Sequence, residues 1–274
     1  MNSDDKFHAN LDTGMALLFR NCVEVVKDLI VSGNIVCSPE GLNISCMDPS
    51  HVALVNLNLP ASMFSSYVCP REFLMGINFD SLSKGLKVMD QKDTLSLSAT
   101  VGGDALGIVI TRPGHEICKL QLNLIVIDEE RMEPPDFDVD AHIVLDAAVL
   151  LRSMRHLTLF GEHVDFSADK ETLAFSSTGD RGSGELSFGS GGGANVELDV
   201  AESVRLRFST KYLLMFSKAS TVSPRVSIEM TKTNPLRVTF PIPEGGSLAY
   251  YLAPTVTDDD SGSDDASGSD QDMA

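Results

Sequence analysis

The chain has 274 residues, a hydrophobic fraction of 43% and a net charge of −18. Its mean hydropathy is near zero. This composition is typical of a soluble globular protein, and the length allows one large domain or two of about 130 residues. No run of about 18 apolar residues occurs, and the first residues are polar and acidic. We therefore expect neither a transmembrane helix nor a secretory signal.

The cysteines indicate which cellular compartments suit the protein, and the charge distribution indicates which kinds of partner it can bind. The five cysteines are scattered and form no C-x-x-C pair, which favours reduced thiols in the cytosol or nucleus. A negative net charge argues against phosphate binding. Seven aspartates, however, lie in the last seventeen residues, and without them the net charge is −11. The distribution of charge therefore matters more than its total.

The first half of the chain predicts two helices and a series of strands. In the first helix, apolar residues recur at i, i+4, i+7 and i+11, from Leu18 to Leu29. The helices are predicted at 12–31 and 80–89, capped by Asp12 or Thr13 and by Asp80 or Ser81. The strands are predicted at 34–37, 41–46, 52–59, 66–70, 94–100, 105–111 and 116–125.

The segment 128–136, Asp-Glu-Glu-Arg-Met-Glu-Pro-Pro-Asp, interrupts this pattern. Its adjacent prolines lack backbone donors and its acids require water, so it cannot continue a central strand. We predict an exposed linker near the middle of the folded part.

The second half repeats the order of the first. The predicted elements are strand 138–145, helix 146–156 capped by Asp146, strands 163–167, 172–177, 184–188 and 195–200, helix 209–218, and strands 225–231, 236–240 and 247–252. We therefore predict the α+β class, with two similar domains of antiparallel sheets and two helices each. The expected limits are 1–123 for the first domain, 124–140 for the connecting loop, 141–256 for the second domain and 257–274 for a disordered acidic tail.

Positive charge is concentrated on the predicted helices. Each helix carries a pair of basic residues beside or opposite its apolar stripe, although acids dilute the first helix. Amphipathic helices ordinarily expose lysine and arginine to water, so a single pair says little. Four pairs in an acidic chain favour a basic surface that follows a phosphate backbone without reading bases.

The stretch from Met47 to Leu59 has two interpretations. Asp48-Pro49-Ser50 forms a turn between Met47 and His51, and from Val52 the apolar alternation predicts a half-buried strand. The simpler interpretation is a hairpin that leads into an ordinary strand. The alternative is that the leading end forms one wall of a surface pocket.

Catalytic motifs are absent from the sequence. It contains no P-loop and no G-x-S-x-G motif, and its histidines and cysteines have no metal-ligand spacing. The glycine-rich run 189–193 leads into a strand rather than a helix, so we predict a hairpin loop rather than a phosphate site. We expect no enzyme activity, no cofactor and no metal.

Several motifs, in order along the chain, resemble one known family. They are Val25-Val-Lys-Asp-Leu-Ile30, Met47-Asp-Pro-Ser-His-Val52, Leu82-Ser-Lys-Gly-Leu-Lys87, Lys211-Tyr-Leu-Leu-Met-Phe-Ser-Lys218 and Tyr250-Tyr-Leu-Ala-Pro254. From about Phe7 to Pro254 the chain resembles the proliferating cell nuclear antigen family of DNA sliding clamps. The resemblance implies the DNA clamp fold, a homotrimeric ring lined by helices, nuclear localisation and no membrane contact. It also implies binding to double-stranded DNA, DNA polymerase, the clamp loader and proteins with a short clamp-binding motif.

The resemblance also implies roles for particular residues. DNA would be faced by Arg20, Lys27, Lys84, Lys87, Arg152, Arg155, Lys211 and Lys218. The partner pocket would contain Met47, His51, Val52, Leu54, Ile127, Met132, Pro134, Pro235, Tyr251, Ala253 and Pro254. Subunits would pair the strand near 116–124 with the edge strand near 180–188, and Lys170 would be a candidate for modification by ubiquitin-like proteins.

Three functions remain open at this point. The first is a DNA clamp that serves as a polymerase processivity factor and a docking platform for replication and repair proteins. The second is a clamp-fold scaffold that binds partner peptides without being loaded on DNA, which the acidic balance and the altered linker would suit. The third, an unrelated α+β enzyme, lacks a catalytic cluster.

Overall fold

The computed structural model describes residues 5–114, 116–128, 132–189 and 195–255. Both halves of the chain have the same order of elements: a strand, a helix, five strands, a second helix and three strands. The predicted two-part α+β organisation is therefore confirmed. No helix in the described ranges is both long and apolar enough to cross a membrane.

The elements of the first half run from β1 to β9. The helices are α1 (Thr13–Val26) and α2 (Phe79–Leu86). The strands are β1 (Lys6–Leu11), β2 (Ser32–Ser38), β3 (Gly41–Met47), β4 (Ala53–Pro60), β5 (Ser66–Val68), β6 (Phe73–Asn78), β7 (Thr94–Thr100), β8 (Ala105–Thr111) and β9 (Ile117–Asn123), with a short 3₁₀ turn η2 (Ala61–Met63).

The second half runs from β10 to β18. The helices are α3 (Ala147–Leu157) and α4 (Thr210–Ser217). The strands are β10 (Ala141–Asp146), β11 (His163–Ala168), β12 (Thr172–Gly179), β13 (Gly182–Gly189), β14 (Glu197–Val200), β15 (Val204–Ser209), β16 (Arg225–Met230), β17 (Leu236–Ile242) and β18 (Gly246–Leu252), with 3₁₀ turns η3 (Lys218–Thr221) and η4 (Pro243–Gly245).

Antiparallel pairing arranges the strands into three sheets. The order β5-β1-β7-β8-β9 belongs to the first half, and β13-β12-β11-β15 belongs to the second. The third sheet, β14-β10-β16-β17-β18-β4-β3-β2-β6, takes strands from both halves. Its two parts meet where β18 pairs with β4, from Leu252 opposite Ala53 to Ser247 opposite Asn58. Within the described residues, β9 and β13 each pair on one side only and are edge strands.

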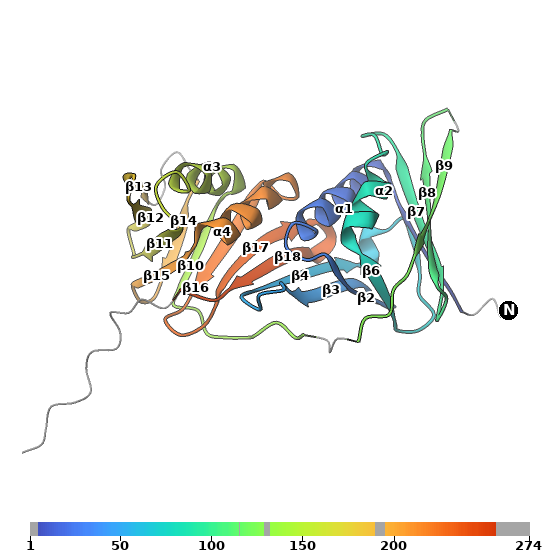
Figure 1. The fold of residues 1–274 in the computed structure, drawn as a ribbon, viewed down its shortest axis with the longest axis horizontal. Coiled ribbons are helices and arrows are strands. Elements are labelled where there is room, and N and C mark those ends of the chain that lie inside the picture. The colour runs from blue at the N-terminus through green and yellow to red at the C-terminus, as the bar shows by residue number, and fades with distance from the viewer. Residues whose placement is uncertain (1–4, 115, 129–131, 190–194, 256–274) are drawn as a thin grey trace, which may run out of the picture.

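The helices lie together on one side of the nine-stranded sheet, and the connecting segment runs along the other side (Figure 1). Each helix packs an apolar stripe inward, for example Leu150 and Met154 in α3 and Leu213 and Phe216 in α4, all of them buried. The polar faces are left outward, because a helix in this position buries one stripe only. The basic pairs therefore lie on a single layer of helices.

The first helix is shorter than predicted. It ends at Val26 instead of continuing to residue 31, and the N–H groups of Leu29 and Ile30 both donate to the Val26 carbonyl. This turn brings the chain round into β2. The sequence pattern predicted a longer helix because Leu29 and Ile30 are apolar and extend the buried stripe. Both residues are indeed buried, but they lie in the turn after the helix.

The helix caps also differ from prediction. At the start of α2 the side chain of Asn78 accepts the Ser81 N–H at 2.8 Å, so the cap is neither Asp80 nor Ser81. Asp146 occupies the N-cap position of α3 but makes no capping hydrogen bond. Its carboxylate accepts instead from Arg225 at 3.1 Å. Arg225 lies in the neighbouring strand, a partner that local sequence cannot reveal.

Three strands were not predicted, namely β1, β6 and β15. In β15 the apolar residues do alternate with arginines, so period-two patterning could have found this strand. In β6 the alternation is broken by Gly76. A methyl group there would overlap the carbonyl oxygen of Ile125, whose N–H donates to the Gly76 carbonyl at 2.9 Å. Gly76 thus lets the connecting segment begin against the edge of the sheet.

Tyr250 lies at the junction between the halves. It is 1% exposed and stacks on Phe216 of α4, with ring centroids 4.4 Å apart and planes at 6°. In β18 it stands opposite Val55 of β4. Its hydroxyl has no hydrogen-bond partner among the described residues, and burial raises the pKa of the phenol. The ring therefore stabilises the junction while the hydroxyl carries a desolvation cost.

We expect Tyr250→Phe to leave the free energy of unfolding unchanged or to raise it by up to about 1 kcal/mol, because it removes an unpaired buried hydroxyl. Tyr250→Ala, the control for the ring itself, should lower that free energy by about 3–5 kcal/mol. Urea denaturation at one fixed protein concentration measures both. A marked loss for the phenylalanine variant would mean that the hydroxyl has a bonded partner.

Candidate DNA-facing and partner-binding surfaces

Two of the predicted basic residues in the first half are held by local partners. Lys84 pairs with Asp80 one turn earlier in α2 at 2.6 Å. Arg20 donates to the backbone carbonyl of Met89 at 2.7 Å and keeps its full charge. Lys84 is therefore partly neutralised, whereas Arg20 still contributes positive charge to the helix layer.

A second ion-pair group joins the two halves on the helix layer. Lys27 lies 3.2 Å from Glu24 and 3.5 Å from Asp28, and Lys218 of the second half lies 2.7 Å from Asp28. Burial alone lowers the pKa of Lys27, but its hydrogen bonds and attraction to the two acids raise it above the ordinary value. Only the pair between Lys218 and Asp28 crosses from one half to the other, and both lysines offer less charge to a ligand.

The remaining four predicted residues are exposed and form no ion pair with a described carboxylate. Lys87, Arg152, Arg155 and Lys211 are exposed, and no carboxylate of the described residues lies within ion-pair distance of them. Lys211 has its ammonium 5.9 Å above the ring centre of Tyr212. Lys87 follows the last residue of α2, where the helix dipole favours positive charge.

The predicted turn at Asp48-Pro49-Ser50 is present, and Asp48 organises it. The Asp48 carboxylate is 4% exposed. It accepts N–H groups from Ser50 (3.1 Å), Val52 (2.8 Å) and Ala53 (2.8 Å), and the hydroxyl of Tyr212 (2.7 Å). Since Tyr212 lies in α4, this single carboxylate connects the β3–β4 turn to the second half.

The protonation of Asp48 follows from these bonds. Burial by itself raises the pKa of the Asp48 carboxyl, but the hydrogen bonds from Ala53, Tyr212, Val52 and Ser50 outweigh it and hold the pKa below its ordinary value. Burial and the bond to Asp48 raise the pKa of the Tyr212 phenol. The ionised carboxylate therefore stabilises the fold above its unfolded-state pKa, and this contribution is lost as the pH falls through the folded-state pKa.

An open cavity of about 400 Å³ lies beside this turn. Three predicted pocket residues line it: Met47, His51 and Met132. His51 has a left-handed backbone with φ of 55°, and the Ser45 hydroxyl donates to the Met132 carbonyl at 2.6 Å. The lining also includes residues that the sequence did not predict, namely Ile30, Val31, Ser32, Ser45, Cys46, Asp48 and Pro49.

A second group of predicted pocket residues forms an apolar cluster next to that cavity. Leu54 and Tyr251 stand opposite each other across β4 and β18. With Ala249 they form a buried cluster separate from the main core, against which Met47 and Phe137 pack. Met47 thus borders both the open cavity and this cluster. Phe137 was not predicted, although an aromatic residue in an acidic linker is a detectable signal.

The other predicted pocket residues lie around these two features. The N–H of Ala253 donates to the Val52 carbonyl at 3.1 Å, which brings the end of β18 to the turn. Ile127 is fixed by Asn34, whose side-chain amide donates to its carbonyl at 3.2 Å. Pro134, Pro235 and Pro254 are half-buried and lie outside the strands. Lys170 is exposed in the turn between β11 and β12.

Family models match nearly the whole chain. The N-terminal domain of proliferating cell nuclear antigen (PCNA) matches residues 7–132, and its C-terminal domain matches residues 133–255. The chain belongs to the PCNA family. It is 35% identical to PCNA of Dictyostelium discoideum over 249 residues, covering 88% of this chain and 96% of that protein. It is 31% identical to PCNA 2 of Drosophila melanogaster over 245 residues, covering 89% and 96%.

Two further relatives support the same assignment. PCNA of Chaetomium thermophilum is 33% identical over 251 residues, with 89% of this chain and 97% of that protein covered. The crystal structure of PCNA from Entamoeba histolytica is similar with a TM-score of 0.85 and 28% identity, covering 91% of this chain and 99% of that chain. These relatives are all eukaryotic.

Membership of the PCNA family assigns the activity. The protein is a DNA sliding clamp, a homotrimeric processivity factor that binds DNA, polymerase and other partner proteins in replication and repair. PCNA-family proteins are scaffolds rather than enzymes. In the part of the chain that the structure describes, no three His, Cys, Asp or Glu residues gather as a metal site, and the five cysteines form no disulfide.

We expect Asp48→Asn to lower the free energy of unfolding of this PCNA-family clamp by about 1.5–3 kcal/mol at neutral pH, because charge-assisted bonds are lost. The difference from wild type should shrink as the pH falls through the lowered folded-state pKa of Asp48, where the native carboxylate also becomes protonated. Denaturation at several pH values and one protein concentration measures this. Asp136→Asn, in the exposed linker, is the control. If the variant and wild type differed in free energy of unfolding by the same amount at every pH, Asp48 would not act as a stabilising ionised carboxylate.

Proposed function

We propose that this clamp surrounds duplex DNA with α1 to α4 facing the central hole, and that it contacts phosphates without reading bases. The observation that carries the proposal is that the helices lie together on one side of the sheet (Figure 1). Their basic residues include the exposed Lys87, Arg152, Arg155 and Lys211. Lys87, Arg152, Arg155 and Lys211 contribute most, since no described carboxylate pairs with them. Arg20, Lys27, Lys84 and Lys218 contribute less.

We propose that the ring closes edge to edge, with β9 of one subunit against β13 of the next. Edge strands carry unpaired backbone groups that a neighbouring strand can satisfy. Ile117 in β9 is 54% exposed, and Leu186 and Phe188 in β13 are only partly buried. Such a contact uses two different surfaces, so repetition around an axis closes a ring.

Partner proteins would dock on the side of the nine-stranded sheet opposite the helices, across the cavity and the apolar cluster. A short peptide in a 3₁₀ turn with aliphatic and aromatic anchors fits two adjacent apolar features whose rim is polar. Met47 borders both features, and His51 stands at the mouth of the cavity. The cavity is lined by the first half and by Met132 of the connecting segment, whereas the apolar cluster takes residues from both halves and from that segment.

Three smaller proposals follow from the family. We propose domain limits of 1–123 and 141–256 with a connecting loop at 124–140; the acidic tail at 257–274 lies outside the described residues. We propose nuclear localisation, in keeping with eukaryotic replication factors. We propose Lys170 as an attachment site for ubiquitin-like proteins, which Lys170→Arg would abolish in a conjugation assay.

The double variant Met47→Ala, His51→Ala should still form rings but lose peptide binding, because it removes contacts to the pocket and leaves the sheet edges intact. Light scattering should give about three times the chain mass of 29.5 kDa. Anisotropy of a labelled clamp-binding peptide measures docking. Leu159→Ala, an exposed apolar truncation elsewhere, is the control and should bind normally. Normal binding by the double variant would contradict the pocket assignment.

The double variant Arg152→Glu, Arg155→Glu should bind DNA more weakly and stimulate a polymerase less on primed circular DNA with a clamp loader. Loss of two phosphate contacts should reduce the slope of log affinity against log salt by about two. The control Arg71→Glu, Lys170→Glu changes the charge equally at exposed sites outside the helices. Equal losses in both variants would indicate a general charge effect and contradict the proposed helix contacts.

A further inference from the structure

Phe137 belongs to the connecting segment, yet its ring packs on the proposed partner pocket. It contacts the cluster of Leu54, Ala249 and Tyr251, beside Met47. This cluster is separate from the main core, so the ring of Phe137 covers a small apolar surface that would otherwise face water.

A cation also contacts the ring, from the residue opposite Tyr251 in the neighbouring strand β17. The guanidinium of Arg237 lies 5.1 Å from the centre of the Phe137 ring, within the range of a cation–π contact. Arg237 is itself fixed by an ion pair with Glu229 on the adjacent strand β16. The pair raises the pKa of Arg237 above its ordinary value, so the charge over the ring is permanent.

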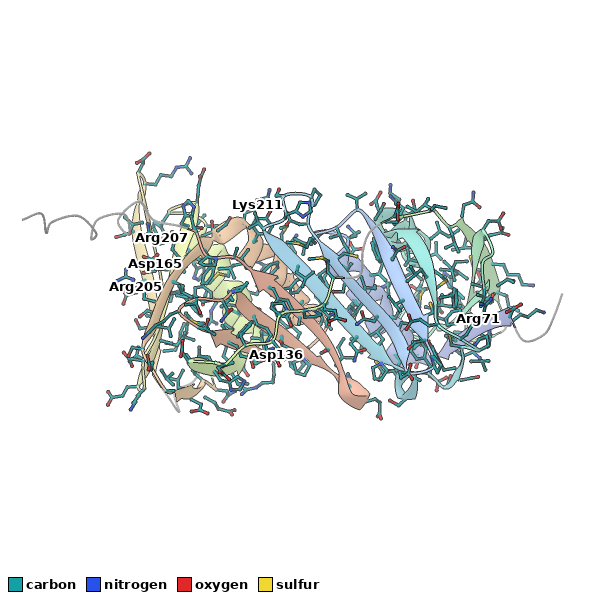
Figure 2. The ribbon with its side chains drawn as sticks, turned by 90° about the horizontal axis from the view of Figure 1, so that it is seen from below. Arg71, Asp136, Asp165, Arg205, Arg207 and Lys211 are labelled. Carbon is teal, nitrogen blue, oxygen red and sulfur yellow. The ribbon has the colours of Figure 1, made fainter. Side chains whose placement is uncertain are left out.

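The backbone on either side of Phe137 is anchored. Upstream, the Met132 carbonyl accepts the Ser45 hydroxyl at 2.6 Å. Downstream, the Asp140 N–H donates to the Met230 carbonyl at 3.1 Å. The connecting segment crosses the face of the sheet opposite the helices, where Asp136 is labelled in Figure 2. Asp136 and Asp138 are exposed whereas Phe137 is half-buried, so only the aromatic side chain is turned to the sheet.

We propose that Phe137 is an internal occupant of the partner pocket, which the aromatic anchor of a bound partner peptide must displace from Leu54 and Tyr251. This proposal rests on the proposed docking function of that surface. An aromatic ring on an apolar floor, capped by a cation, is the environment that a partner's own aromatic side chain would require. The cavity on the other side of Met47 stays open, so competition is confined to one half of the pocket.

The internal occupant lowers the apparent affinity for every aromatic partner, because the pocket is available only when Phe137 has left it. Release should be local, since Ser45 and Asp140 hold the segment on each side through backbone groups. The reduction is the same factor for every partner that must displace the ring, so it leaves the order of preference among aromatic partners unchanged.

Phe137→Ala tests the proposal by removing the competing ring. The full-length variant should bind a fluorescein-labelled peptide, with one aliphatic anchor and two adjacent aromatic residues, about three- to tenfold more tightly than wild type. Asp136→Ala, which removes a neighbouring exposed side chain but no ring, is the matched control and should not gain this affinity. Unchanged or weaker binding by Phe137→Ala would overturn the proposal and make Phe137 a wall of the pocket.

Phe137→Trp gives a second, direct readout because the chain contains no tryptophan. Its emission should shift to the red when an unlabelled peptide without tryptophan is added, as the indole moves into water. A blue shift or no shift while the peptide binds would overturn displacement. If wild type, Phe137→Ala and Phe137→Trp all fail to bind the peptide, the proposed docking function fails, and this proposal fails with it.

Discussion

The antiparallel pairing of β18 with β4 is the contact on which the rest of the molecule depends. It turns the strands of two similar halves into one nine-stranded sheet. The sheet has helices on one side and the connecting segment on the other (Figure 1). The pairing also sets Tyr251 opposite Leu54, so the floor of the proposed partner pocket exists only while the halves are joined. The bond between Asp48 and Tyr212 and the stacking of Tyr250 on Phe216 reinforce the same junction.

This acidic chain can bind a polyanion such as DNA because its basic residues gather on the helix layer, while many of its acidic residues lie elsewhere. On the helix layer itself, however, Glu24, Asp28 and Asp80 engage lysines that the sequence suggested were available. Exposed pairs of this kind add little stability, but they lower the local positive potential. The clamp therefore binds DNA through fewer unpaired cations than it carries. Such weak and salt-sensitive contact suits a ring that must slide, since tight phosphate contacts would hold it in place.

The face of the sheet opposite the helices, where partners are proposed to dock, differs from the helix layer. Its main feature is apolar surface that the chain itself covers, whereas the helix layer exposes charge. One feature is an open cavity and its neighbour is filled by Phe137. Covering an aromatic floor with the chain's own ring limits unspecific apolar contact in the free protein. The arrangement also sets a threshold that a partner has to exceed before it docks. The threshold is the same for every partner that must displace the ring, so selectivity among those partners arises from fit.

The sequence by itself determined the class, the four helices with most of the strands between them, the basic helix faces and the turn at Asp48, because these follow from local periodicity and turn chemistry. It also carried the alternation of β15, which the strand prediction overlooked. Only the tertiary structure decided which charges are free and what fills the pocket. Lys218 meets Asp28 across 190 residues and Tyr212 meets Asp48 across 164, and Phe137 reaches Tyr251 through the folded sheet. Contacts of this kind depend on which strands pair, and no local pattern in the chain encodes that pairing.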